Sequence, residues 1–155
     1  NEGGISTPFI VRWPGHVKPG TMTGQMGHII DVVPTCLELA GGQRLAEVNG
    51  EKAPPLDGRS LAPIFRGEAR PAPERLFWEW SGNCAMREGQ WKAVWDTLNP
   101  AKQWQLYDVV ADRTELHDLA TAQPARLQAM TAAYVAWAKE LGRKLPGAKG
   151  KKSED

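Results

Sequence analysis

Four short runs rich in aromatic residues decide the fold of the second half of this chain: Leu76-Phe-Trp-Glu-Trp80, Cys84-Ala-Met-Arg-Glu88, Trp91-Lys-Ala-Val-Trp-Asp96 and Trp104-Gln-Leu-Tyr-Asp108. Aromatic residues recurring with a period of two are typical of strands. Glu88-Gly89-Gln90 is a tight turn between the second and third runs, and connections this short favour antiparallel pairing. The sequence therefore predicts a small four-stranded antiparallel sheet.

A helix is expected to cover this sheet. Pro124 stands at a favoured first-turn position, and an apolar stripe follows it at helical spacing. The stripe consists of Leu127, Met130, Tyr134, Trp137 and Leu141. We expect the helix to run from about residue 124 to 141 and to lie across the sheet. Residues 143–155 contain glycine, proline and several basic residues, and are expected to form a flexible, solvated tail.

The first half of the chain has a different pattern. Residues 28–41 have apolar residues at helical spacing, with Asp31 as a candidate cap and Gly41 after the last turn. Residues 42–55 are polar and are expected to be irregular, and a short helical turn is expected from Ser60. The connector 68–74 contains Pro71 and Pro73, so we place a domain boundary there.

The opening fifteen residues contain a flexible Gly3-Gly4 pair followed by the apolar run Phe9-Ile-Val11. Pro8 favours an extended chain before the run, and Pro14-Gly15 ends it. This pattern predicts a buried strand over residues 9–13.

The opening residues also carry a resemblance. Glu2-Gly-Gly-Ile5, then Pro8 and Ile10-Val-Arg-Trp-Pro-Gly15, closely resemble the segment after the active-site lysine of type I sulfatases and arylsulfatases, in the alkaline-phosphatase superfamily. Later segments match in the same order: the Pro34-Thr35 helix ending in Leu-Ala-Gly41, Leu56-Asp-Gly-Arg-Ser-Leu61, and the turn 113–119. Asn1 replaces a common tyrosine, Ser6 a common arginine, Arg113 the usual proline, and Asp118 the usual asparagine.

The resemblance implies that this chain is the C-terminal part of a sulfuric ester hydrolase, with an α+β fold. Residues 1–67 would contribute a strand and a helix at the edge of a large α/β domain. Residues 68–142 would form a C-terminal subdomain with the four-stranded sheet and its helix, and 143–155 the tail. The upstream domain would be the natural partner of this chain. A periplasmic or extracellular location is compatible with such an enzyme.

The family's nucleophile is a formylglycine made from cysteine in a Cys-x-Pro-x-Arg motif, and its usual metal is calcium. Neither Cys36 nor Cys84 stands in that motif. The sequence therefore assigns no catalytic, cofactor-binding or metal-binding residue to this chain, and substrate-binding residues stay unassigned. The chain alone is expected to be inactive. Both cysteines are expected to be buried packing residues.

Several residues are candidates for chemistry, although a structural role is favoured for each. Asp108, Asp112, Glu115 and Asp118 cluster, but lack the Gly-centred spacing of a calcium loop, so a solvated acidic turn is favoured. His28 precedes the helix and is a candidate for an active-site rim, against a structural histidine. Trp78 and Trp80 share one strand face, as do Trp91 and Trp95; core between sheet and helix is favoured over a sugar-stacking surface.

Composition excludes some classes of function. The 19 basic and 18 acidic residues nearly cancel, which leaves no basic footprint for nucleic acid. No apolar stretch approaches the roughly 18 residues that suggest a membrane span.

Two alternatives for function remain open. A phosphonate or phosphodiester hydrolase of the same superfamily would share this C-terminal region. A non-catalytic carbohydrate-binding or assembly module is a second alternative. As an isolated chain, the protein is also expected to form a homodimer, or to exchange a segment around residues 5–40, because the first strand and helix would lack their partners.

Overall fold

The computed structural model describes residues 2–147, which divide into two compact units. The first, called here the sheet unit, contains residues 2–7 together with 74–147. The second, called here the α2 unit, contains residues 8–73. The opening residues therefore group with the far end of the sequence and not with the residues that follow them.

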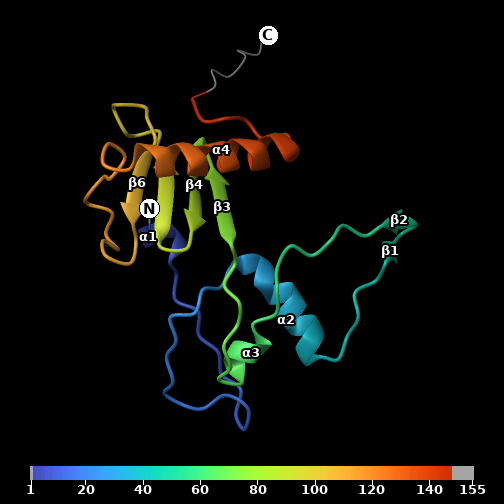
Figure 1. Ribbon diagram of the computed structural model, residues 1–155. Coiled ribbons are helices and arrows are strands. Elements are labelled where there is room, and N and C mark those ends of the chain that lie inside the picture. The colour runs from blue at the N-terminus through green and yellow to red at the C-terminus, as the bar shows by residue number, and fades with distance from the viewer. Residues whose placement is uncertain (1, 148–155) are drawn as a thin grey trace. The chain divides into compact units, whose positions relative to one another are not determined.

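The sheet unit contains the predicted four-stranded antiparallel sheet (Figure 1). Its strands are β3 (Arg75–Trp80), β4 (Asn83–Glu88), β5 (Trp91–Trp95) and β6 (Gln105–Asp108), hydrogen-bonded in that order. The two-residue loop between β3 and β4 has positive φ at Ser81 (49°) and Gly82 (80°). Such a turn matches the twist of paired strands, so short connections enforce the antiparallel order.

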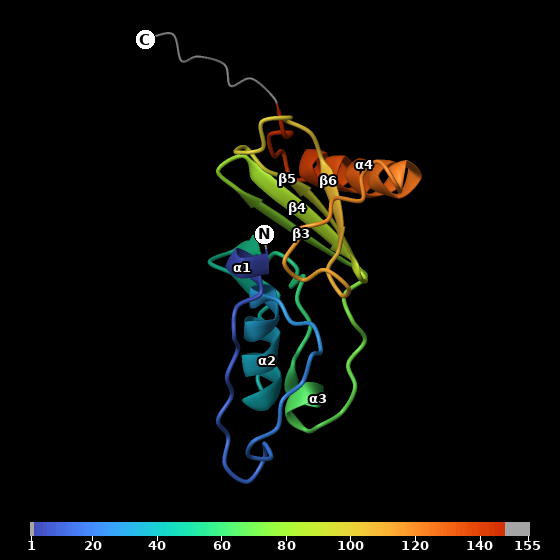
Figure 2. The ribbon, with the colours of Figure 1, turned by 90° about the vertical axis from the view of Figure 1, so that its left-hand side faces the viewer.

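Helix α4 (Pro124–Glu140) covers one face of this sheet (Figure 2), as predicted. The buried core between them consists of Cys84, Met86, Ala93, Leu106, Met130, Tyr134 and Ala138. Trp137 stacks on Phe77 of β3, with ring centroids 4.8 Å apart and planes inclined by 5°. The predicted stripe is wrong at Leu141, which is 53% exposed because the helix ends one residue earlier; Ala138 packs there instead.

The tryptophans divide between the two faces of the sheet. Trp91 and Trp95 pack in the core beneath α4, as predicted. Trp78 packs on the opposite face, in a cluster with Ala85, Val94, Tyr107 and Val109, and Trp80 is 80% exposed. The prediction that Trp78 and Trp80 lie between sheet and helix is wrong. Side chains alternate along a strand, and Phe77 occupies the position in β3 that faces α4.

The α2 unit contains the predicted amphipathic helix in two pieces, the 3-10 turn η1 (Ile29–Asp31) and α2 (Val32–Leu39). A second short helix, α3 (Ala62–Phe65), follows in the segment expected to turn from Ser60. The segment 42–55, expected to be irregular, contains a small hairpin of β1 (Glu47–Val48) and β2 (Glu51–Lys52). Its turn is Asn49-Gly50, and both residues have positive φ.

Two expectations for the first half are wrong. Residues 9–13 form no strand: Phe9 and Ile10 are 63% and 88% exposed, and no neighbouring strand pairs with them among the described residues. A lone apolar run cannot satisfy its backbone groups as a strand without a partner. Cys36, expected to be buried, is exposed on α2. Residues 148–155 of the predicted tail lie outside the described residues.

Replacing Trp137 with alanine tests the packing of α4. The change removes the ring that stacks on Phe77, and we expect it to lower the free energy of unfolding by about 3 kcal/mol, the lower end for a large aromatic because the ring is only partly buried. Urea denaturation followed by tryptophan fluorescence and circular dichroism measures this. Leu141→Ala is the matched control and should change stability by less than about 0.5 kcal/mol. Equal losses in both variants would contradict the packing described here.

Candidate functional site

A fully buried lysine is the centre of the sheet unit's polar interior. Lys92 lies on β5 and points away from α4, since its neighbour Ala93 faces the helix. Its Nζ donates to Glu2 Oε1 at 3.0 Å and to Glu115 Oε1 at 2.5 Å. A buried charge is tolerated in a protein interior only when it is paired and hydrogen-bonded. We call these three residues the Lys92 cluster.

The turn between β6 and α4 places Glu115 opposite Lys92. Asp112 shapes this turn, because its Oδ2 accepts the backbone N–H of Leu116 at 2.8 Å and of His117 at 2.7 Å. The hydrogen bond from the His117 backbone is the largest of the effects that lower the pKa of Asp112. Glu115 itself has a φ of 57°, in the left-handed region. A non-glycine residue there signals a backbone that surrounding contacts hold in place.

The opening segment, residues 2–6, contacts this turn at two further points. Glu2 N–H donates to Glu115 Oε2 at 3.3 Å, at the start of the short helix α1 (Glu2–Ile5). Arg113 Nη2 donates to Ser6 Oγ at 2.8 Å. Ser6 and Arg113 are two of the positions at which the sequence departs from the type I sulfatase pattern. The two departures therefore contact each other.

The Lys92 cluster has an excess of negative charge, with two carboxylates and one ammonium. Tyr107 of β6 lies opposite Lys92 in the strand register. Burial is the main cause that raises the pKa of Tyr107 to about 12, and the nearby carboxylates of Asp118 and Glu115 add to it. The phenol therefore stays protonated at neutral pH. The cluster holds segments together and presents no nucleophile.

The acidic residues considered for calcium each have a local role. Asp108 accepts the backbone N–H groups of Val110 and Ala111, and Asp118 accepts those of Leu106 and Ala120. Asp112 and Glu115 have the partners described above. Within residues 2–147 no group of three or more histidine, cysteine, aspartate or glutamate side chains is arranged to hold a metal ion. Their oxygens are directed to N–H donors and do not converge on one point.

Asp31 is the polar centre of the α2 unit. Its Oδ2 accepts Arg70 Nη2 at 3.1 Å and the His28 backbone N–H at 2.9 Å, while Oδ1 accepts the Arg59 N–H at 2.8 Å. Both side chains of the Asp31–Arg70 pair are only 4% exposed. The Asp31 carboxylate therefore takes part in a capping box at η1, which bears out its expected role at the first turn, although it makes no cap hydrogen bond to α2 itself. It also joins the helix to the connector through Arg70.

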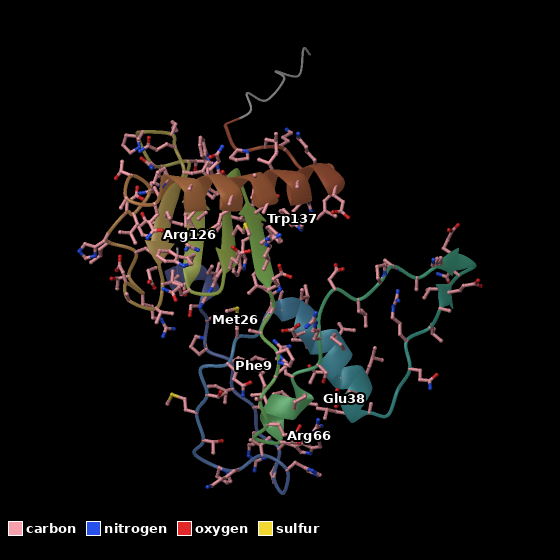
Figure 3. The ribbon with its side chains drawn as sticks, viewed as in Figure 1. Phe9, Met26, Glu38, Arg66, Arg126 and Trp137 are labelled. Atoms are coloured by element: carbon pink, nitrogen blue, oxygen red, sulfur yellow. The ribbon has the colours of Figure 1, made fainter. Side chains whose placement is uncertain are left out.

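The other candidate residues of the α2 unit have structural roles as well. His28 Nδ1 accepts the Ile30 N–H at 3.4 Å, so His28 caps η1. Thr35 Oγ1 donates to the Asp31 carbonyl at 2.6 Å and accepts the Leu61 N–H at 2.8 Å. The exposed pair Glu38–Arg66 joins α2 to the end of α3 at 3.3 Å, as the two labelled side chains in Figure 3 show.

An apolar groove of about 280 Å³ runs along α2. One wall is formed by residues 9–12, and the others by α2 and by the segment around α3. Phe9 stacks on Phe65 across it, with ring centroids 6.4 Å apart, and Cys36 is exposed at its edge. Cys84, in contrast, is buried as expected, and burial raises the pKa of its thiol to about 11. Cys84 is thus an unreactive packing residue.

The sequence of this chain matches a known protein family. A family model described as "N-sulphoglucosamine sulphohydrolase, C-terminal" matches residues 1–135. The chain belongs to this family of sulfatase C-terminal regions. The match contains the whole Lys92 cluster and the sheet, and it confirms the sulfatase resemblance of the sequence.

Curated relatives are larger sulfatases. An uncharacterized sulfatase of Schizosaccharomyces pombe is 32% identical over 155 residues, covering 91% of this chain and 26% of the relative. The choline-sulfatase of Rhizobium meliloti is 36% identical over 123 residues, covering 77% of this chain and 22% of the relative. The matched part of the chain spans between 11% and 26% of the length of curated relatives such as these.

Two solved structures have a similar fold over most of this chain. The crystal structure of Ps i-CgsB has a TM-score of 0.62 and 28% identity, covering 92% of this chain and 30% of the other. A structure designated BT33336S-sulf, from work on Bacteroides thetaiotaomicron, has a TM-score of 0.65 over 85% of this chain; at 24% identity it shows the fold alone. Within residues 2–147, no helix has the length and apolar character needed to cross a bilayer.

Sequence reasoning missed the Lys92 cluster. One signal was present: Lys92 lies between Trp91 and Ala93 in an apolar run, and the next residue on its own face of the strand is Val94. A lysine inside a strand that is apolar on both faces needs a buried partner. The sequence does not indicate which of its carboxylates would be that partner, since Glu2 and Glu115 lie 90 and 23 residues away.

Changing Asp31 to asparagine tests the polar centre of the α2 unit. The change leaves Arg70 without its buried counter-charge and should cost about 3 kcal/mol of stability. Thermal unfolding by circular dichroism at neutral pH measures the loss. Glu38→Gln, in an exposed ion pair on α2, is the matched control and should leave the transition unchanged. A null effect of Asp31→Asn would mean that the connector does not depend on this carboxylate.

Proposed function

We propose that the longer protein containing this chain is a sulfuric ester hydrolase, and that this chain supplies its C-terminal subdomain and not its chemistry. The observation that carries the proposal is the family match over residues 1–135. The sequence contains no Cys-x-Pro-x-Arg motif, so the formylglycine nucleophile belongs upstream. The relatives, all sulfatases several times longer, support the same division.

The metal of such an enzyme belongs upstream as well. Calcium needs six or more oxygen ligands that converge. The carboxylates of this chain are directed to backbone N–H groups, to Lys92 and to Arg70. The residues described here therefore do not fit a calcium site, and this chain contributes no step through the metal.

An activity assay tests the proposal directly. The longer protein, purified with added calcium, should hydrolyse 4-nitrophenyl sulfate, whereas the chain of residues 1–155 should not. Changing the cysteine of the upstream motif to alanine should abolish turnover in the longer protein. Turnover by the isolated chain, lost on changing one of its own residues, would show that the chemistry lies here.

The same preparation tests the alternative that the enzyme is a phosphonate or phosphodiester hydrolase. Such an enzyme would turn over bis(4-nitrophenyl) phosphate faster than the sulfate ester.

The carbohydrate-binding alternative rests on Trp80. Among residues 2–147 it is the most exposed aromatic residue, at 80%. Glycan-array binding by the isolated chain, lost in Trp80→Ala, would favour that module.

We also propose that the isolated chain associates through the α2 unit. Phe9, Ile10, Ile29 and Val33 are exposed, and the apolar groove lies beside them. Burying ~400 Å² of such surface contributes about 10 kcal/mol before association costs, at roughly 25 cal/mol per Å². The occupant is a second copy of residues 5–40, as a homodimer or an exchanged segment. In the full-length protein the upstream domain would take that place.

Light scattering at micromolar concentration checks this assembly. The wild-type chain should have the mass of a dimer, and Ile10→Ser should shift it toward the monomer, because the change removes apolar surface without touching a buried contact. Val110→Ser, an equally apolar and exposed site in the sheet unit, is the control and should not change the mass. A wild-type monomer with residues 9–13 protected from hydrogen exchange would contradict the proposal.

A further inference from the structure

The opening segment is attached to a part of the chain that lies far away in sequence. Residues 2–7 group with the sheet unit, although residues 8–73 form a separate unit between them. We propose that Lys92 and Glu115 are positioning residues: they anchor the opening segment on the C-terminal sheet through Glu2, and so fix the chain that leads into Glu2 in the full-length sulfatase. The claim about the full-length sulfatase rests on the proposed function.

The contacts show that the anchor is specific. Lys92 Nζ is fully buried and bridges one oxygen of Glu2 and one of Glu115. The second oxygen of Glu115 accepts the backbone N–H of Glu2, so both the side chain and the main chain of Glu2 are held. Charge-assisted hydrogen bonds of this kind are roughly twice as strong as neutral ones. The three groups therefore fix the direction of the backbone at Glu2 as well as its place.

The rest of the opening segment offers no alternative anchor of this strength. Gly3 and Gly4 are exposed, and a Cβ placed on either would meet no other part of the chain within 4 Å. The Ser6–Arg113 hydrogen bond is exposed and is worth little where water competes. Without the Lys92 cluster, the segment would keep its own short helix and the exposed Ser6–Arg113 hydrogen bond, and four-residue helices are not stable alone.

This anchor has a consequence for catalysis. By resemblance, the residues just before Glu2 in a type I sulfatase carry an active-site lysine. A catalytic group works only when it is held in place, and a displacement of about 1 Å can cost about a hundredfold in rate. Lys92 and Glu115 would act through the segment, without contacting the substrate.

Glu2→Gln is the most selective test in the full-length protein. It keeps the size of the side chain and leaves the Lys92–Glu115 pair in place, so the sheet should stay folded. We expect amide hydrogen exchange of residues 2–6 to become about tenfold faster, with exchange in β4 and β5 unchanged. We expect kcat for 4-nitrophenyl sulfate to fall about tenfold, with a smaller change in KM. Glu2→Asp, which keeps the charge, should recover part of the lost rate.

Two further variants separate positioning from stability. Arg75→Gln breaks an exposed ion pair with Glu88 on the same sheet and should alter neither exchange nor rate. Lys92→Met should show the Glu2→Gln effects in stronger form, together with lower stability. Unchanged exchange of residues 2–6 in Glu2→Gln would overturn the anchor, and faster exchange with wild-type kcat would overturn its catalytic role. If the wild-type protein has no sulfatase activity, the proposed function fails, and exchange alone decides the anchor.

Discussion

The structure of the sheet unit depends on the requirement that a buried ammonium group be surrounded by acceptors. Lys92 is fully buried, and the two carboxylates that satisfy it lie 90 residues before it and 23 residues after it in the sequence. The strand β5, the turn around Glu115 and the opening segment must therefore meet at one point. The α4 core on the other face of the sheet is apolar and tolerates small shifts more easily. The polar contact brings these three segments together, and burial of the apolar face supplies the bulk of the stabilisation.

Much of the sheet unit could be predicted from the sequence, although single positions could not. The strands, their order and α4 followed from patterns of period two and 3.6, because hydrophobic burial is repeated at every second or fourth residue. The errors concern single positions. Leu141 lies beyond the end of α4, and Phe77 occupies the core position in β3 that was expected for Trp78. Periodicity shows which residues share a face of an element, but it gives neither the face that meets α4 nor the end of the element.

The polar sites were harder to predict, for a physical reason. A carboxylate finds its partner through folding, and sequence distance does not constrain the choice: Asp31 meets Arg70 across 39 positions, and Glu2 meets Lys92 across 90. The opening strand failed for a related reason. Residues 9–13 have the composition of a strand, but a strand needs a neighbour, and the described residues contain none for it. The hairpin at Asn49-Gly50 was also missed, because residues 42–55 were expected to be irregular, although Asn-Gly is a typical hairpin turn.

The discontinuous sheet unit matters for any recombination of this chain with a relative. A chimaera joined at Glu74 would transplant the sheet, its Lys92 and its Arg113, yet keep the recipient's opening residues. A recipient with arginine at position 6 would then place two guanidinium groups against each other, where this chain has a hydroxyl and one guanidinium. The compact unit of this chain is discontinuous, because residues 2–7 belong with residues 74–147. A recombination that moves both segments together keeps the hydroxyl of Ser6 opposite the guanidinium of Arg113.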